Sequence, residues 1–208
     1  MLKVGETRVT KLPDSMDGIR FTVGRMVKMI EEGRKDPLVI ETARKIAALA
    51  TSGRKLKGGG RERDLWVLKA IHAWCRANFE FVKDPVGVEL LQTPNRMLMQ
   101  LAIPPLLHKA MWEPIGKVLG GKMPAPKMNG DADEATTLSL ALAAAVGIAP
   151  LKIMLGGAEG AVYTCWGAAY AGGAKKSEPA QMWDMDILHD KFGSHQAAEQ
   201  LEDVDVTL

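Results

Sequence analysis

The pattern of apolar and polar positions predicts helices throughout the first half of the chain. In residues 15–33 apolar side chains recur every three or four positions, and Ser15 precedes this run as a candidate N-cap. Residues 37–50 repeat the same period. Residues 64–81 show it most clearly, with Asp64 as a candidate cap. We therefore expect two N-terminal helices and then a longer third helix.

Breaks in this pattern mark the connections. Residues 53–63 combine basic residues with three consecutive glycines and predict a surface loop, because no strand precedes them as one would in a phosphate-binding loop. A further helix is expected from the Thr93-Pro94 pair to about residue 103. Residues 104–130 mix a short amphipathic piece with proline and glycine, which indicates an excursion inserted into the domain or an arm that binds a partner.

The strongest local signal is the sequence GDADEATTLSLALAAAVGI at 130–148. Asp131 and Glu134 have the spacing of a capping box, which makes residue 132 the first residue of a central helix. Many small side chains in this helix indicate close packing. Its expected buried side contains Leu138, Ala141, Leu142 and Ala145.

Strand patterns follow this helix at 150–155, 161–171 and 181–187. Helices first and strands afterwards indicate an α+β fold, with a helical N-terminal half and the capped helix packed on a small antiparallel sheet. At 208 residues the chain fits a single domain, 1–208. We divide it into N-terminal helices at 15–50, a core at about 40–195 and the excursion at about 104–130.

Composition restricts the function classes. A net charge of +2 gives no electrostatic case for a nucleic-acid or anionic-membrane partner. The two cysteines, Cys75 and Cys165, form no metal-binding or disulfide pattern. No apolar stretch has the length of a membrane span or the position of a signal sequence. We expect a soluble, cytoplasmic protein without a metal or cofactor.

The start of the central helix is also the place where a nucleophile would be best activated. A helix N-terminus stabilises a thiolate through the helix dipole and its unpaired N–H groups. A histidine on the next strand can serve as base, and a carboxylate on the strand after that can orient the histidine. Positions 132 and 161 and the pair Asp184 and Asp186 occur in this order.

These blocks resemble the transglutaminase-like superfamily, in particular the bacterial and phage-associated members of the papain-like cysteine hydrolase fold. The resemblance covers about residues 40–195. It is carried by the following segments: ARKIAAL (43–49), RDLWVLKAIHAWCRANFEFVKDPVGVELLQTP (63–94), GDADEATTLSLALAAAVGI (130–148), AVY (161–163) and WDMD (183–186).

Two of the three catalytic positions that the resemblance implies are occupied by alanine. Ala132 stands where the family has its cysteine nucleophile, and Ala161 stands where it has its histidine base. The third position is acidic, and Asp186 fits it better than Asp184. Because a methyl group cannot exchange a proton or attack a carbonyl, thiol-based acyl transfer by this triad is abolished.

Other readings of these residues stay open. Cys165 lies four residues into the strand that starts at 161 and is expected to be a core thiol rather than a substitute nucleophile. His189 and His195 could supply a base but have no nucleophile to act on. The segment GDADEATT could be only a well-capped helix start. Ala132 could also result from natural degeneration or from engineering, and Ala161 favours natural loss.

We therefore expect a catalytically degenerate domain that acts as a structural or binding module with a protein partner or as an oligomer. The phage-associated relatives implied by the resemblance suggest a virion or assembly protein, which would make it virion-associated. The alternative is a cysteine hydrolase or acyltransferase, of protease or amidase type, that is silenced by Ala132.

Overall fold

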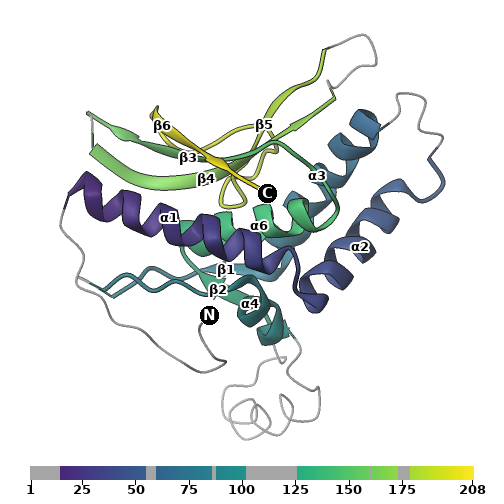
Figure 1. Cartoon of the computed structure of the whole chain (residues 1–208), viewed down its shortest axis with the longest axis horizontal. Helices are drawn as coiled ribbons and strands as arrows, with labels where there is room; N and C mark the ends of the chain where they lie inside the picture. The colour runs from purple at the N-terminus through teal and green to yellow at the C-terminus, as the bar shows by residue number, and fades with distance from the viewer. Residues whose placement is uncertain (1–14, 55–59, 86–87, 102–125, 160, 173–178) are drawn as a thin grey trace, which may run out of the picture.

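The computed structural model describes residues 15–54, 60–85, 88–101, 126–159, 161–172 and 179–208, and in them the chain has the expected α+β class. The first three helices are α1 (Met16–Gly33), α2 (Pro37–Thr51) and α3 (Gly60–Asn78), followed by α4 (Pro94–Leu101) and α6 (Ala132–Ala145) (Figure 1). Among the described helices, none is long and apolar enough to cross a bilayer.

The strands form two sheets. β1 (Phe79–Phe81) pairs in parallel with β2 (Met128–Gly130). The second sheet is antiparallel and has the order β5-β4-β3-β6, as expected for the second half of the chain. Its strands are β3 (Leu151–Ala158), β4 (Ala161–Ala171), β5 (Gln181–Met185) and β6 (Glu199–Val206).

Helix α6 lies at the centre of the fold and is enclosed on all sides. Every residue from Glu134 to Ala144 is buried. The helix contacts α1, α2, α3 and α4, and it packs on β4 of the larger sheet (Figure 1). The sequence predicted one buried side, but small side chains around the helix let neighbours approach from every direction. On β4, a Cβ added to Gly167 would lie 2.8 Å from Leu140 Cδ2, so glycine permits this close approach.

One helix start differs from the prediction. α3 begins at Gly60 and not at Asp64. It ends at Asn78 because the next three residues pair with β2 instead of continuing the helix. Ser15 occupies the N-cap position of α1, but its side chain makes no capping hydrogen bond. In contrast, Asp36 caps α2 by accepting from Leu38 N at 2.8 Å.

Strand β6 was not predicted, and it lies beyond residue 195, where the expected core ends. Its sequence EQLEDVDV is rich in acidic residues, which are uncommon in strands. The strand forms because its edge position leaves alternate side chains in solvent, while Val204 and Val206 pair with Ile153 and Leu151 of β3. Of the expected excursion at 104–130, residues 102–125 lie outside the described part of the chain.

Because α6 is enclosed, the fold should be most sensitive to shortening of the side chains on this helix. Replacing the fully buried Leu140 with alanine should lower the free energy of unfolding by about 2–5 kcal/mol, because a cavity forms in the centre of the fold. Leu49→Ala is the matched control, since Leu49 is 79% exposed and should change stability little. Urea unfolding followed by circular dichroism measures both; equal losses would contradict the central position of α6.

Candidate functional site

The N-terminus of α6 is held by the predicted capping box. Asp131 accepts a hydrogen bond from Asp133 N at 2.9 Å, and Glu134 Oε2 accepts one from Asp131 N at 3.0 Å. Glu134 Oε1 also accepts from Gln92 N at 2.9 Å, which ties the segment before α4 to the helix start. A Cβ added to Gly130 would lie 2.6 Å from Glu134 Cβ, so glycine leaves the space that this carboxylate needs.

Ala132 is the first residue of α6, as the sequence predicted, and it is half-buried against the core. The nearest chemical group of interest is the thiol of Cys165 on β4. Its Sγ lies 3.6 Å from Ala132 O, 3.0 Å from Asp133 Oδ1 and 3.4 Å from Thr136 Oγ1. The structure therefore brings a thiol to the start of the helix, although from the strand and not from the helix itself.

The surroundings of Cys165 keep this thiol protonated. Burial, and after it the negative charge of Asp133, raise the pKa of the Cys165 thiol well above its usual value. The S–H group donates to Asp133, and a thiolate in its place would face a carboxylate at the same distance. The expectation of a buried core thiol is confirmed, since Cys165 is 5% exposed.

Ala161 lies in a different setting from Ala132. It is the exposed first residue of β4 and pairs with Ala158 across the β3–β4 hairpin. Four residues of strand, about 13 Å at the usual rise, separate it from Cys165. The role of position 161 as the base position stays a prediction, but the β4 residue that contacts the start of α6 is residue 165.

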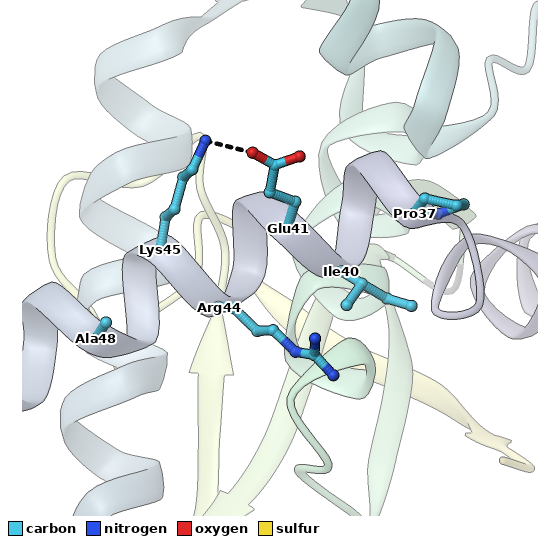
Figure 2. A pocket seen from close by; sticks show the side chains of 6 residues that line it. All are labelled: Pro37, Ile40, Glu41, Arg44, Lys45 and Ala48. Atoms are coloured by element: carbon cyan, nitrogen blue, oxygen red, sulfur yellow. Dashed lines mark hydrogen bonds and ion pairs between the residues drawn. The ribbon is translucent and has the colours of Figure 1, made fainter.

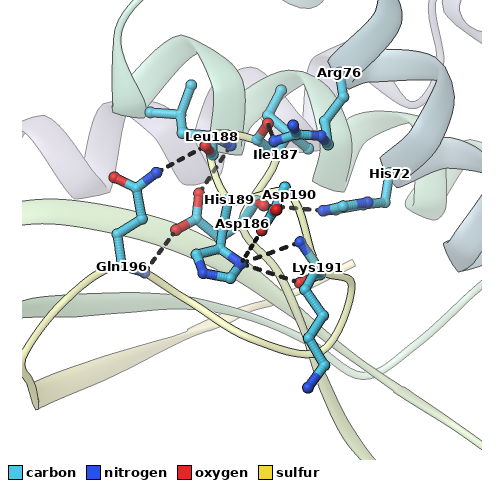
Figure 3. Close-up of polar contacts among 9 residues, drawn as sticks. All are labelled: His72, Arg76, Asp186, Ile187, Leu188, His189, Asp190, Lys191 and Gln196. Carbon is cyan, nitrogen blue, oxygen red and sulfur yellow. Dashed lines mark hydrogen bonds and ion pairs between the residues drawn. The ribbon is translucent and has the colours of Figure 1, made fainter.

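Asp186 organises the loop that follows β5. Its Oδ1 accepts from Leu188 N at 3.0 Å and its Oδ2 accepts from Gln196 N at 3.1 Å. Gln196 Nε2 in turn donates to Leu188 O at 2.7 Å, which closes the loop (Figure 3). Both carboxylate oxygens of the expected orienting acid are thus used by backbone N–H groups of its own loop.

The same loop is fastened to α3 by two side chains. His72 Nε2 lies 3.0 Å from Asp186 O, and Arg76 donates to Ile187 O at 3.3 Å (Figure 3). Burial lowers the pKa of His72, so the neutral ring that donates to a carbonyl is favoured. These contacts give His72 a structural role between α3 and this loop.

Asp184, the second choice for the acid, lies on the opposite face of the sheet from Cys165. Its Oδ1 accepts from Trp166 Nε1 at 2.8 Å, and the Trp166 ring stacks on His195 with centroids 4.2 Å apart. His189 Nδ1 accepts from Lys191 N at 3.1 Å within its own loop. In the described structure, neither His189 nor His195 has a hydrogen bond to Cys165.

Carboxyl groups gather beside the start of α6. Glu89 lies beside Asp133, and the interaction between the two carboxyl groups contributes to raising the pKa of Glu89. Burial, followed by the charges of Asp133, Asp131 and Asp84, raises the pKa of Glu89 to about 8. Burial also raises the pKa of Glu134 to about 8, although the hydrogen bonds from Asp131 N and Gln92 N act in the opposite direction.

Three of these residues are the described groups that could hold a hard cation. Asp84, Glu89 and Asp131 each place a carboxylate oxygen within 4.8 Å of the others. Oxygen ligands of this kind suit Ca²⁺ or Mg²⁺. Protonation of Glu89 accommodates the same charges without an ion, so the cluster alone does not indicate a metal centre.

Two features of this site were missed in the sequence. One is the contact between Cys165 and Asp133. The alternation of β4 places residues 161 and 165 on one face, but it does not show which of them lies beside the helix. The other is the approach of Glu89 to Asp133, which are 44 positions apart and have no shared local pattern.

Comparisons with known proteins identify no relative: no family model, curated protein or solved structure matches this chain.

The raised pKa of Glu89 predicts a pH-dependent stability. Between its usual pKa of 4.5 and about 8, the folded chain holds a proton that the unfolded chain releases. This contribution is fully present below pH 4.5 and is lost as the pH rises through about 8. Glu89→Gln keeps a hydrogen-bond donor for Asp133, so the free energy of unfolding should fall less steeply with rising pH.

Urea unfolding at intervals from about pH 5 to about pH 9 measures how the free energy of unfolding changes with pH. EDTA is added to exclude cations. Glu80→Gln is the matched control, because Glu80 is exposed on the neighbouring strand β1. The free energy of unfolding of Glu89→Gln should still depend on pH to some extent, since Glu134 also has a raised pKa. Identical slopes in the wild type and Glu89→Gln would show that the carboxyl pair is not protonated.

Proposed function

We propose that this chain is a catalytically degenerate transglutaminase-like domain that acts as a structural or binding module. The observation that carries the proposal is the chemistry at the start of α6. The first helical position holds the methyl group of Ala132, and the thiol that reaches this helix start, Cys165, is buried and hydrogen-bonded to Asp133. A protonated, buried thiol is a poor nucleophile.

The described contacts of this thiol also include no histidine. Within the described residues its hydrogen-bond partners are a carboxylate, a carbonyl and a hydroxyl group. His72 contacts Asp186 O, and His195 stacks on Trp166. His108 lies outside the described residues. The triad that the resemblance implies uses an imidazole base within hydrogen-bond reach of the thiol, and the described contacts of Cys165 supply none, so they support a non-catalytic role.

The packing of the α6 start on the following strand β4 supports the papain-like part of the proposal, because that fold combines residues from these two elements in its active site. The role as a phage virion or assembly component enters through the resemblance to phage-associated members of the superfamily. A module of this kind would act through a protein partner or through copies of itself, in the cytoplasm or in a virion.

One observation favours a second candidate, a cysteine hydrolase or acyltransferase silenced at residue 132. The capping box is complete although the nucleophile is absent, so the environment that would activate a thiolate is still formed. If this candidate is correct, restoring the missing groups should restore reactivity. The two candidates can therefore be distinguished in one set of variants.

Thiol labelling provides this test. Ala132→Cys is combined with Cys165→His, the strand position that contacts the helix start, and separately with Ala161→His. At about pH 6 an activated thiolate should react with a thiol-directed acyl electrophile at least about tenfold faster than an ordinary exposed thiol. For a scaffold we expect no such acceleration. Mass spectrometry assigns the labelled residue, and circular dichroism verifies the fold.

Ala48→Cys on the exposed side of α2 provides the reference rate for an ordinary thiol. In the folded wild type, Cys75 and Cys165 should both resist labelling, and both should react after unfolding, because burial raises the pKa of each thiol. Rapid labelling confined to residue 132 in either double variant would reject the scaffold proposal and favour the silenced enzyme.

A further inference from the structure

The small net charge conceals a strong separation of charge along the chain. Residues 16–78, which include α1, α2 and α3, contain fourteen lysines and arginines and seven acidic residues. Residues 79–208 contain ten lysines and arginines and sixteen acidic residues. The first part is therefore clearly basic and the second clearly acidic. Such a separation matters for association, because potentials of opposite sign attract partners over several ångströms.

The basic charge is exposed on the outer side of α2 and the start of α3. We define the arginine face as the set Arg44, Lys45, Arg54, Arg61 and Arg63. A shallow depression of about 560 Å³ follows α2, with Ile40 and Arg44 on one side of the helix and the Glu41–Lys45 ion pair on the other (Figure 2). A second depression of about 390 Å³ adjoins it and is lined by Arg44, Arg63 and the end of α6.

The cations of the arginine face are only partly neutralised. Lys45 pairs with Glu41 at 2.6 Å, and Arg63 pairs with Asp64 at 3.0 Å. Arg44 has no ion pair among the described residues, although it lines both depressions. The face is thus concave, positively charged and open to solvent. A partner that fits it must be negatively charged and must project from its own surface.

The edge strand β6 has the required charge, and it lies at the end of its sheet. It contains Glu199, Glu202, Asp203 and Asp205 and has no lysine or arginine. Arg20 of α1 pairs with Glu202, and Lys152 of β3 pairs with both aspartates, so two cations face four carboxylates. Glu199 is exposed, and the side chain of Asp205 is 76% exposed. The strand is at the end of the sheet, away from α2 in Figure 1.

We propose that the arginine face of one chain binds strand β6 of a second copy, so that the protein associates head to tail. The two surfaces are different and lie on different sides of the molecule, so after pairing one copy still has a free β6 and the other still has a free arginine face. A contact of this kind is heterologous, and it builds a ring when its rotation closes or a filament when it does not. This inference extends the proposed structural role, but it does not depend on the loss of catalysis.

The salt dependence of association is the first test. Opposite charges at exposed surfaces are screened within about 8–10 Å at physiological ionic strength and within about 3 Å at 1 M. At low salt the weight-average mass from sedimentation velocity should rise with protein concentration. At about 0.5 M NaCl it should return to the 22.5 kDa of a single chain. A single-chain mass at every concentration in low salt would overturn the proposal.

Charge reversal on each surface tests the pairing itself. Arg44→Glu with Arg61→Glu reverses the arginine face, and Glu199→Arg with Asp205→Arg reverses β6. Each double variant alone should self-associate at least about tenfold more weakly than the wild type. Mixed together, they again offer surfaces of opposite charge, intact with intact and reversed with reversed, so the mixture should recover the association that each variant alone has lost. Failure of the mixture to pair would contradict head-to-tail binding.

The matched control is Lys28→Glu with Arg96→Glu, which changes the net charge equally but lies on α1 and α4. This control should associate like the wild type. If its association is weakened as much as that of the arginine-face variant, only the overall charge matters, and the proposal is overturned. Circular dichroism verifies the fold of every variant. The outcome is independent of the labelling experiment, since a silenced enzyme could also assemble and a scaffold could be monomeric.

Discussion

Glu134 accepts backbone N–H groups from Asp131 and from Gln92, and this side chain fixes the centre of the fold. The first bond closes the capping box of α6, and the second attaches the segment between β1 and α4 to the helix start. Because α6 is buried from Glu134 to Ala144, unpaired N–H groups in its first turn would be costly. The helices and the sheet can enclose α6 only when its first turn is satisfied from within.

The same arrangement explains the electrostatics of the site. A helix start attracts negative charge, and here the chain has placed Asp84, Glu89, Asp131 and Asp133 around it. The helix dipole compensates only part of this charge, so protonation of Glu89 supplies the rest. A thiol in such surroundings is held as S–H. The acidic neighbours and the burial of Cys165 therefore oppose the thiolate that a helix N-terminus would otherwise favour.

The sequence predicted what depends on local chemistry. The capping box, the position of residue 132, the succession of a helical half and a strand-rich half, and the burial of Cys165 all follow from spacing and period, and the structure agrees with them. The predictions that failed concern contacts between segments that are distant in the sequence. Phe79–Phe81 leaves the helical pattern because it pairs with β2, and β6 forms because β3 offers it an edge. The proximity of Glu89 and Asp133 could not be predicted for the same reason. The net charge of +2 is a sum over the whole chain, so it does not show that the basic residues lie on helices and the acidic ones on a strand.

The capping box has a further consequence for how this chain can change over time. Both of its side chains, Asp131 and Glu134, flank residue 132 and leave that residue out of the hydrogen bonds that start the helix. Replacement of the side chain at residue 132 can therefore alter reactivity while the capping box stays intact. Selection can act on the chemistry and on the architecture separately, and a lineage can lose an activity here while it inherits an intact scaffold for a different use.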